Sequence, residues 1–124
     1  MLEGVQPACF VATRDPVRAR RFYEGTLGLP FHGDDGLALK FDLAGIPLRV
    51  SKVHRFAPAA HTVLGWEVPD ISARVAALAA AGVQFEKYAG FEQDAAGVWT
   101  SPDGTKVAWF KDPDGNILSL AQHG

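Results

Sequence analysis

Residues 106–122 read KVAWFKDPDGNILSLAQ, a turn sequence between two apolar stretches. Pro113 fixes φ at a value suited to a turn, and Gly115 accepts a positive φ. The stretches on either side are short and rich in aromatic and branched residues, as strands are. The segment therefore predicts a β-hairpin that closes the chain.

Size and composition predict a single domain, residues 1–124. A chain of 124 residues, 48% of them hydrophobic, can bury one proper core, because domains commonly run to about 100–150 residues. Its net charge of −2 provides no basic field for nucleic acid or an anionic membrane, so neither is an expected partner. Cys9 is the only cysteine, which excludes an intrachain disulfide and a cysteine-based zinc site. With no basic leader and no apolar run near the ~20 residues of a membrane span, a cytoplasmic location is expected.

The first half of the chain predicts a strand, a helix and three more strands. Residues 8–13 (ACFVAT) are apolar, and Asp15 then caps a helix with Pro16 in its first position. Apolar residues follow at helical spacing until Gly28 ends the helix. Further strands are expected near residues 30–32, at 37–43 and at 47–53, separated by glycine turns.

The second half repeats this order after a connector, residues 54–60. Residues 62–68 predict a strand, Asp70 caps a second helix that Gly82 ends, and residues 83–88 predict the next strand. From helix cap to final glycine turn, the second half is about fifteen residues longer, most of them between positions 88 and 105. Two such units predict one pseudo-symmetric domain, in which neither half buries its sheet face alone.

The hairpin and the phrase Asp15…Arg21-Phe22-Tyr23…Leu27-Gly28-Leu29 together resemble the vicinal-oxygen-chelate superfamily, which includes glyoxalase I, bleomycin resistance proteins and extradiol dioxygenases. The resemblance extends over essentially the whole chain. It implies an α+β fold of two βαβββ modules, about residues 6–53 and 61–122, that form an open barrel-like curved mixed sheet with helices on the convex face. The concave face then makes a ligand cavity. The resemblance also implies a homodimer, because in many relatives two chains complete the cavity.

Metal-using members of this superfamily hold their ion with four side chains, typically His, Glu or Gln, from the first and last strands of each unit. The equivalent positions here are Ala8, Val63, Arg49 and Ser119. Alanine and valine have no donor atom, arginine is a permanent cation, and a serine hydroxyl alone is a weak ligand. We therefore expect no metal and no other cofactor. His61, in the same strand phase as Val63, is a further candidate for a functional residue near the barrel end.

Strand alternation in the same register predicts which side chains line the cavity. Arg49 is placed to hold a carboxylate, phosphate or phenolate, while Phe10 and Trp109 are placed to stack on a flat ligand. Core packing explains the two aromatic side chains equally well. The predicted ligand-binding residues are Phe10, Arg49, Ser51, Glu67, Trp109 and Ser119.

Glu67 is the one catalytic candidate, acting as a base if burial raises its pKa. The alternative is that Arg49 and Glu67 form structural ion pairs or lie at the exposed rim. Trp99, in the long insertion, and Phe56, in the connector, are placed where a cavity lid or a dimer contact can form. Simple packing also accounts for both.

The sequence thus favours a metal-independent small-molecule-binding protein whose ligand is aromatic or anionic. The alternative is an enzyme: a lyase or isomerase that uses Glu67 with Arg49, or a glyoxalase-like protein with its metal site at other residues. A non-catalytic regulatory or subunit-like domain is a third class.

Overall fold

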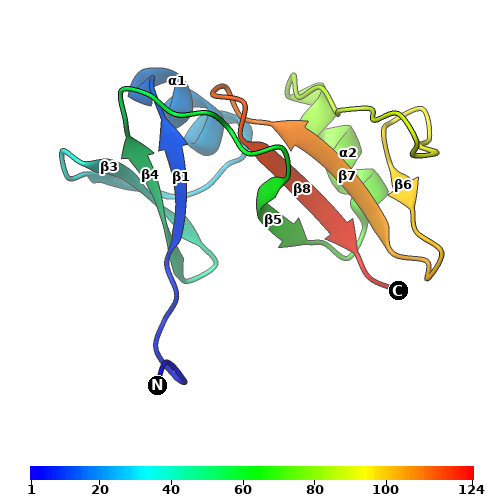
Figure 1. Ribbon diagram of the computed structural model, residues 1–124, viewed down its shortest axis with the longest axis horizontal. Coiled ribbons are helices and arrows are strands. Elements are labelled where there is room, and N and C mark those ends of the chain that lie inside the picture. The colour runs from blue at the N-terminus through cyan, green and yellow to red at the C-terminus, as the bar shows by residue number, and fades with distance from the viewer. The chain divides into compact units, whose positions relative to one another are not determined.

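The computed structural model describes residues 1–124, which form an α+β fold of two units, Met1–Ala57 and Pro58–Gly124. Each unit contains an open, mixed sheet of four strands with helical segments between its first and second strands (Figure 1). The expected α+β fold with two βαβββ units is confirmed. The assignment of both units to one domain stays a prediction.

In the first unit the strand order is β1-β4-β3-β2, with β1 parallel to β4 and the other pairs antiparallel. Helix α1 begins after Asp15, whose carboxylate accepts a hydrogen bond from the Arg18 N–H at 3.2 Å, as the sequence predicts. It continues directly into a wider π-helix, η1, in which the Leu27 N–H donates to the Phe22 carbonyl at 2.9 Å. The elements are β1 Cys9–Thr13, α1 Pro16–Arg20, η1 Arg21–Thr26, β2 Phe31–Asp34, β3 Ala38–Leu43 and β4 Ile46–Lys52.

The core of the first unit lies between η1 and one face of this sheet. Tyr23 is fully buried there, with its ring centroid 5.7 Å from that of Phe41. Leu48 and Val50 of β4 are buried on the same face. The alternate side chains of the strands, Arg49 among them, project from the opposite face, which we name the first open face.

In the second unit the order is β5-β8-β7-β6, with β5 parallel to β8. The hairpin expected from residues 106–122 is present as β7 and β8, and α2 contacts both strands (Figure 1). Asp70 caps α2 by accepting from the Ala73 N–H at 3.1 Å. Neither α1 nor α2 has the length and apolar character of a membrane-crossing helix. The elements are β5 Thr62–Glu67, α2 Ile71–Ala80, β6 Trp99–Thr100, β7 Lys106–Lys111 and β8 Ile117–Gln122.

The predicted strand at residues 83–88 is wrong, because this segment makes only one isolated bridge, Phe85 to Phe110. The Glu86 N–H donates to the Trp109 carbonyl at 2.8 Å, so this segment pairs with one end of β7 only. The other end of β7 pairs with Trp99 and Thr100. Two short segments, residues 85–86 and Trp99–Thr100, therefore pair with opposite ends of β7 at the edge of the sheet. The residues between these segments do not pair with β7.

Candidate functional site

An aromatic pocket of about 570 Å³ lies on the face of the second sheet opposite α2, which we name the second open face. Trp109 reaches it from β7, while its neighbours Ala108 and Phe110 point to the helix side and are fully buried. Strand alternation thus places Trp109 as the sequence predicts. The pocket is lined by Ala60, His61, Thr62, Tyr88, Ala89, Phe91, Trp109 and Ile117.

The aromatic rings at this pocket contact one another directly. The Trp109 centroid lies 5.5 Å from that of Tyr88 and 5.5 Å from that of Phe91. Trp99 continues the cluster, with its centroid 5.0 Å from Phe91. Because neighbouring rings at these distances are in van der Waals contact, no cation fits between them as in an aromatic cage. Only the outer faces of these rings are open to the pocket.

Tyr88 contributes its ring to the pocket rather than its hydroxyl. The hydroxyl oxygen is inaccessible and has no hydrogen-bond partner. Burial raises the pKa of Tyr88, and the nearby Glu86 carboxylate raises it further. The side chain is therefore neutral at physiological pH, and it presents a flat, uncharged surface to a ligand.

A second pocket of about 490 Å³ lies on the first open face and contains several basic side chains. We name it the basic pocket. Lys40 and Arg49 stand opposite each other on β3 and β4, so their side chains leave the sheet on the same side. The pocket is lined by Gln6, His32, Lys40, Phe41, Asp42, Gly45, Pro47 and Arg49.

Two ion pairs join the Asp34-Asp35 turn to β4 beside this pocket. Arg49 Nη2 donates to Asp35 Oδ2 at 2.7 Å, and this hydrogen bond, helped by the Ala38 and Leu37 N–H groups, lowers the pKa of Asp35 to about 2. Lys52 Nζ donates to Asp34 Oδ2 at 2.7 Å and likewise lowers the pKa of Asp34. The turn is held by these contacts with its carboxylates ionised.

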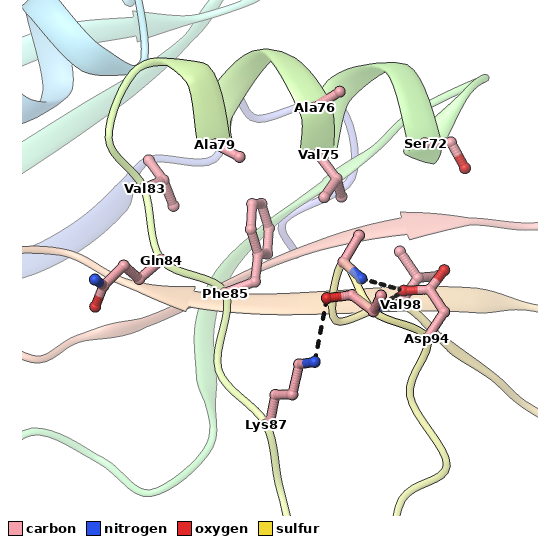
Figure 2. Close-up of a pocket in the computed structure, with 12 residues that line it drawn as sticks. Ser72, Val75, Ala76, Ala79, Val83, Gln84, Phe85, Lys87, Asp94 and Val98 are labelled. Carbon is pink, nitrogen blue, oxygen red and sulfur yellow. Dashed lines mark hydrogen bonds between the residues drawn. The ribbon is translucent and has the colours of Figure 1, made fainter.

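A third pocket, of about 400 Å³, lies on the helix side of the second sheet (Figure 2). The Phe85 ring points toward α2, and Ala76 and Ala79 of the helix also line this pocket. Its charged groups are engaged elsewhere: Lys87 Nζ donates to the Ala95 carbonyl at 3.1 Å, and Asp94 Oδ1 accepts from the Val98 N–H at 2.9 Å. Most of its lining is apolar, and its polar side chains without a hydrogen-bond partner are Ser72 and Gln84.

The predicted ligand-binding residues fall into two groups, one in each unit. Phe10 is directly opposite Arg49 across β1 and β4, and it is 60% exposed. Ser51 is the next side chain of β4 on the same face. Trp109 is opposite Ser119 across β7 and β8.

Glu67 lines none of the three pockets. Its side chain is 70% exposed, and its carboxylate is hydrogen-bonded to His123 near the C-terminus. The burial expected of a carboxylate in an enclosed active site is therefore missing.

Tyr88, Phe91 and Lys40 line pockets but were not predicted from the sequence. Tyr88 ends the segment wrongly predicted as a strand, and Phe91 lies in the following part of the chain, for which no strand is predicted, so alternation gives no reliable phase for either. Lys40 could have been predicted from the sequence, because it lies between Leu39 and Phe41 in β3 and both of these are buried.

The four positions equivalent to metal ligands do not fit a metal ion. Ala8 and Val63 supply no donor, and Val63 lies at a register irregularity of β5. Arg49 is bonded to Asp35, and Ser119 brings only a hydroxyl. Nowhere in residues 1–124 do three or more His, Cys, Asp or Glu side chains form a group that could hold a metal ion.

The sequence matches no protein-family model and no curated protein, whereas several solved structures are similar over nearly its full length. A glyoxalase family protein from Enterococcus faecalis is 19% identical with a TM-score of 0.74, covering 98% of this chain and 99% of that one. A member of the glyoxalase/bleomycin resistance protein/dioxygenase superfamily from Sphaerobacter thermophilus is 20% identical with a TM-score of 0.71, covering 96% and 98%. A lactoylglutathione lyase from Agrobacterium tumefaciens is 15% identical with a TM-score of 0.73, covering 97% and 93%. At these identities the likeness concerns the fold.

Proposed function

We propose that this chain, which has the fold of the glyoxalase/bleomycin resistance protein/dioxygenase superfamily, is a metal-independent member that binds a small aromatic molecule. The aromatic pocket on the second open face carries this proposal. Its volume of about 570 Å³ is in the range of small-molecule sites, which run from about 300 to 1,000 Å³. Three of its lining residues are aromatic, and no carboxylate lines it.

The chemistry of the lining favours a planar, uncharged ligand. A flat ring gains offset or edge-to-face contact with Trp109 and Phe91, worth about 0.5–1.5 kcal/mol per ring pair beyond the area buried. His61 is exposed at this pocket and can hydrogen-bond a polar substituent. A cationic drug of the kind bound by bleomycin resistance proteins would find no opposite charge in this lining.

The binding test uses 1-naphthol, a planar neutral probe, with titration calorimetry. Phe91→Ala should weaken binding about tenfold or more, because Phe91 is 43% exposed and its ring faces the ligand rather than the core. Leu37→Ala, which removes a 75% exposed apolar side chain from the first unit, is the matched control and should leave binding unchanged. Equal affinity in wild-type and Phe91→Ala proteins would refute the proposal.

An enzyme remains the second candidate function. A lyase or isomerase using Glu67 with Arg49 requires a Glu67 carboxylate of raised pKa near the ligand, and the exposed carboxylate bonded to His123 argues against that role. A glyoxalase-like metalloenzyme requires donors that the equivalent positions do not supply. A homodimer and a cytoplasmic location also stay predictions, and light scattering of the purified protein measures the first of these.

A further inference from the structure

We infer that the basic pocket on the first open face is a binding site for a small oxyanion, either a carboxylate or a phosphate. This site lies in the first unit, and its lining shares no residue with the aromatic pocket. Oxyanion binding here can therefore be tested independently of aromatic-ligand binding at the other pocket.

Lys40 and Arg49 form a cross-strand pair of like charges, which is the first observation behind this site. Directly opposite residues of an antiparallel pair have Cβ atoms about 4.5–5.5 Å apart, and two like charges so placed destabilise the sheet. Asp35 balances the charge of Arg49. Lys40 has no such partner, because its Nζ takes part in no hydrogen bond or ion pair. The pocket thus contains a cation, Lys40, that makes no direct hydrogen bond or ion pair within the protein.

Arg49 also keeps unused donors on the pocket side. Its guanidinium has five N–H donors in a planar fork, and only Nη2 is bonded to Asp35. The side chain is 28% exposed, so its remaining donors are only partly hydrated. A carboxylate or phosphate matches the spacing of such a fork and is bound more strongly there than in open water.

The remaining polar groups of the basic pocket are compatible with binding of an oxyanion. Asp42 is the only carboxylate in the lining, and its Oδ1 accepts a hydrogen bond from the Gly45 N–H at 3.0 Å, which directs it to the turn. The Gln6 amide nitrogen donates to the Gly45 carbonyl at the same turn. His32 is exposed and adds a donor from β2. The lining therefore combines two permanent cations with one engaged carboxylate.

The experiment titrates the protein separately with inorganic phosphate and with succinate, at constant ionic strength set by chloride, and follows backbone amide chemical shifts. We expect saturable shifts at β3 and β4. Lys40→Met should weaken binding about tenfold, since a hydrogen bond to a charged group is worth about 1.5–3 kcal/mol. Asp35→Asn should strengthen it, because Arg49 then loses its competing carboxylate. Arg18→Met, an exposed cation of α1, is the matched control and should change nothing.

The two probes separate the two sources of the oxyanion. Saturation by phosphate alone identifies a phosphorylated ligand, and saturation by succinate alone identifies a carboxylic acid. Absence of saturable shifts with both probes overturns the site. So does binding that Lys40→Met leaves unchanged, provided that the amide spectrum shows the variant to be folded.

Discussion

The carboxylate of Asp35 holds the turn and pairs with Arg49 at the same time. Its Oδ1 accepts from the Leu37 and Ala38 N–H groups in the turn, while its Oδ2 accepts from Arg49. The pKa of Asp35 is about 2 in the folded protein against 3.8 normally, so the ion pair adds stability above pH 3.8. This contribution is lost as the pH falls through the folded pKa of about 2.

Asp35→Asn should therefore be less stable than the wild type near neutral pH, with the difference shrinking in acid. The amide oxygen of asparagine can still accept hydrogen bonds from the turn N–H groups, but the neutral side chain cannot form an ion pair with Arg49. Urea unfolding of both proteins between neutral pH and about pH 2 measures the difference. A gap between the two proteins that stays constant across this range would show that the ion pair adds no stability.

Gly65 is required by a close approach between β5 and β8. A Cβ atom at this position would lie 2.9 Å from Ser119 Oγ and 3.3 Å from the Ser119 carbonyl oxygen. Gly65→Ala should destabilise the fold by about 1–3 kcal/mol, the usual cost of overpacking. Adding Ser119→Ala removes the nearer contact and should restore part of the loss, as a double-mutant cycle of urea unfolding would measure. Independent, additive effects of the two substitutions would contradict this account.

In the segment between α2 and β6, the side chain of Gln93 makes three hydrogen bonds to the backbone. Its amide nitrogen donates to the Glu86 carbonyl at 2.9 Å and the Gly97 carbonyl at 2.7 Å, and its oxygen accepts from the Tyr88 N–H at 2.8 Å. These three bonds replace the strand pairing that the segment lacks. Phe91 lies within the loop so formed, which places it beside Trp109.

Gln93→Leu should loosen the insertion without unfolding the sheet. Amide hydrogen exchange should accelerate at Tyr88, whose N–H donates to Gln93, while the β7 and β8 amides keep their protection. Binding of 1-naphthol should weaken as well, because Phe91 is no longer held. Glu92→Leu is the matched control, since Glu92 is exposed and its side chain takes part in no hydrogen bond or ion pair. Unchanged exchange at Tyr88 would mean that other contacts hold the loop.

The helices and the hairpin were predictable because their signals are local. Asp15 and Asp70 cap α1 and α2 through their own side chains, and Pro113 and Gly115 specify the turn between β7 and β8. The π-helical turn of η1 gave no such signal. The short strand β6 gave none either, because its pairing with β7 depends on contacts distant in sequence. Residues 83–88 have strand-like composition but reach β7 at one bridge only.

The repeat of the two halves was the strongest prediction from sequence, and the likeness to solved structures of the superfamily confirms the fold it implied. The alternation of β4 and β7 places Arg49 and Trp109 on the faces opposite the buried side chains, while their role in ligand binding stays a prediction. The surroundings of those residues were not predictable. The aromatic pocket and the basic pocket also contain side chains from loops and from other strands. The periodicity of β4 and β7 carries no information about those side chains.

Metal content tests the proposal for the entire chain. Stable sites for zinc and similar ions require three or four donors in fixed geometry, and the chain offers no such group. Its four histidines are dispersed: His32 lines the basic pocket, His54 is exposed after β4, His61 lines the aromatic pocket, and His123 is bonded to Glu67. Protein purified without chelators, incubated with zinc, nickel, manganese or iron(II) and then dialysed should retain far less than one equivalent by elemental analysis. Naphthol binding should also be unaffected by a chelator. Retention of one equivalent, with loss of ligand binding when it is stripped, would contradict metal independence and would favour the glyoxalase-like alternative.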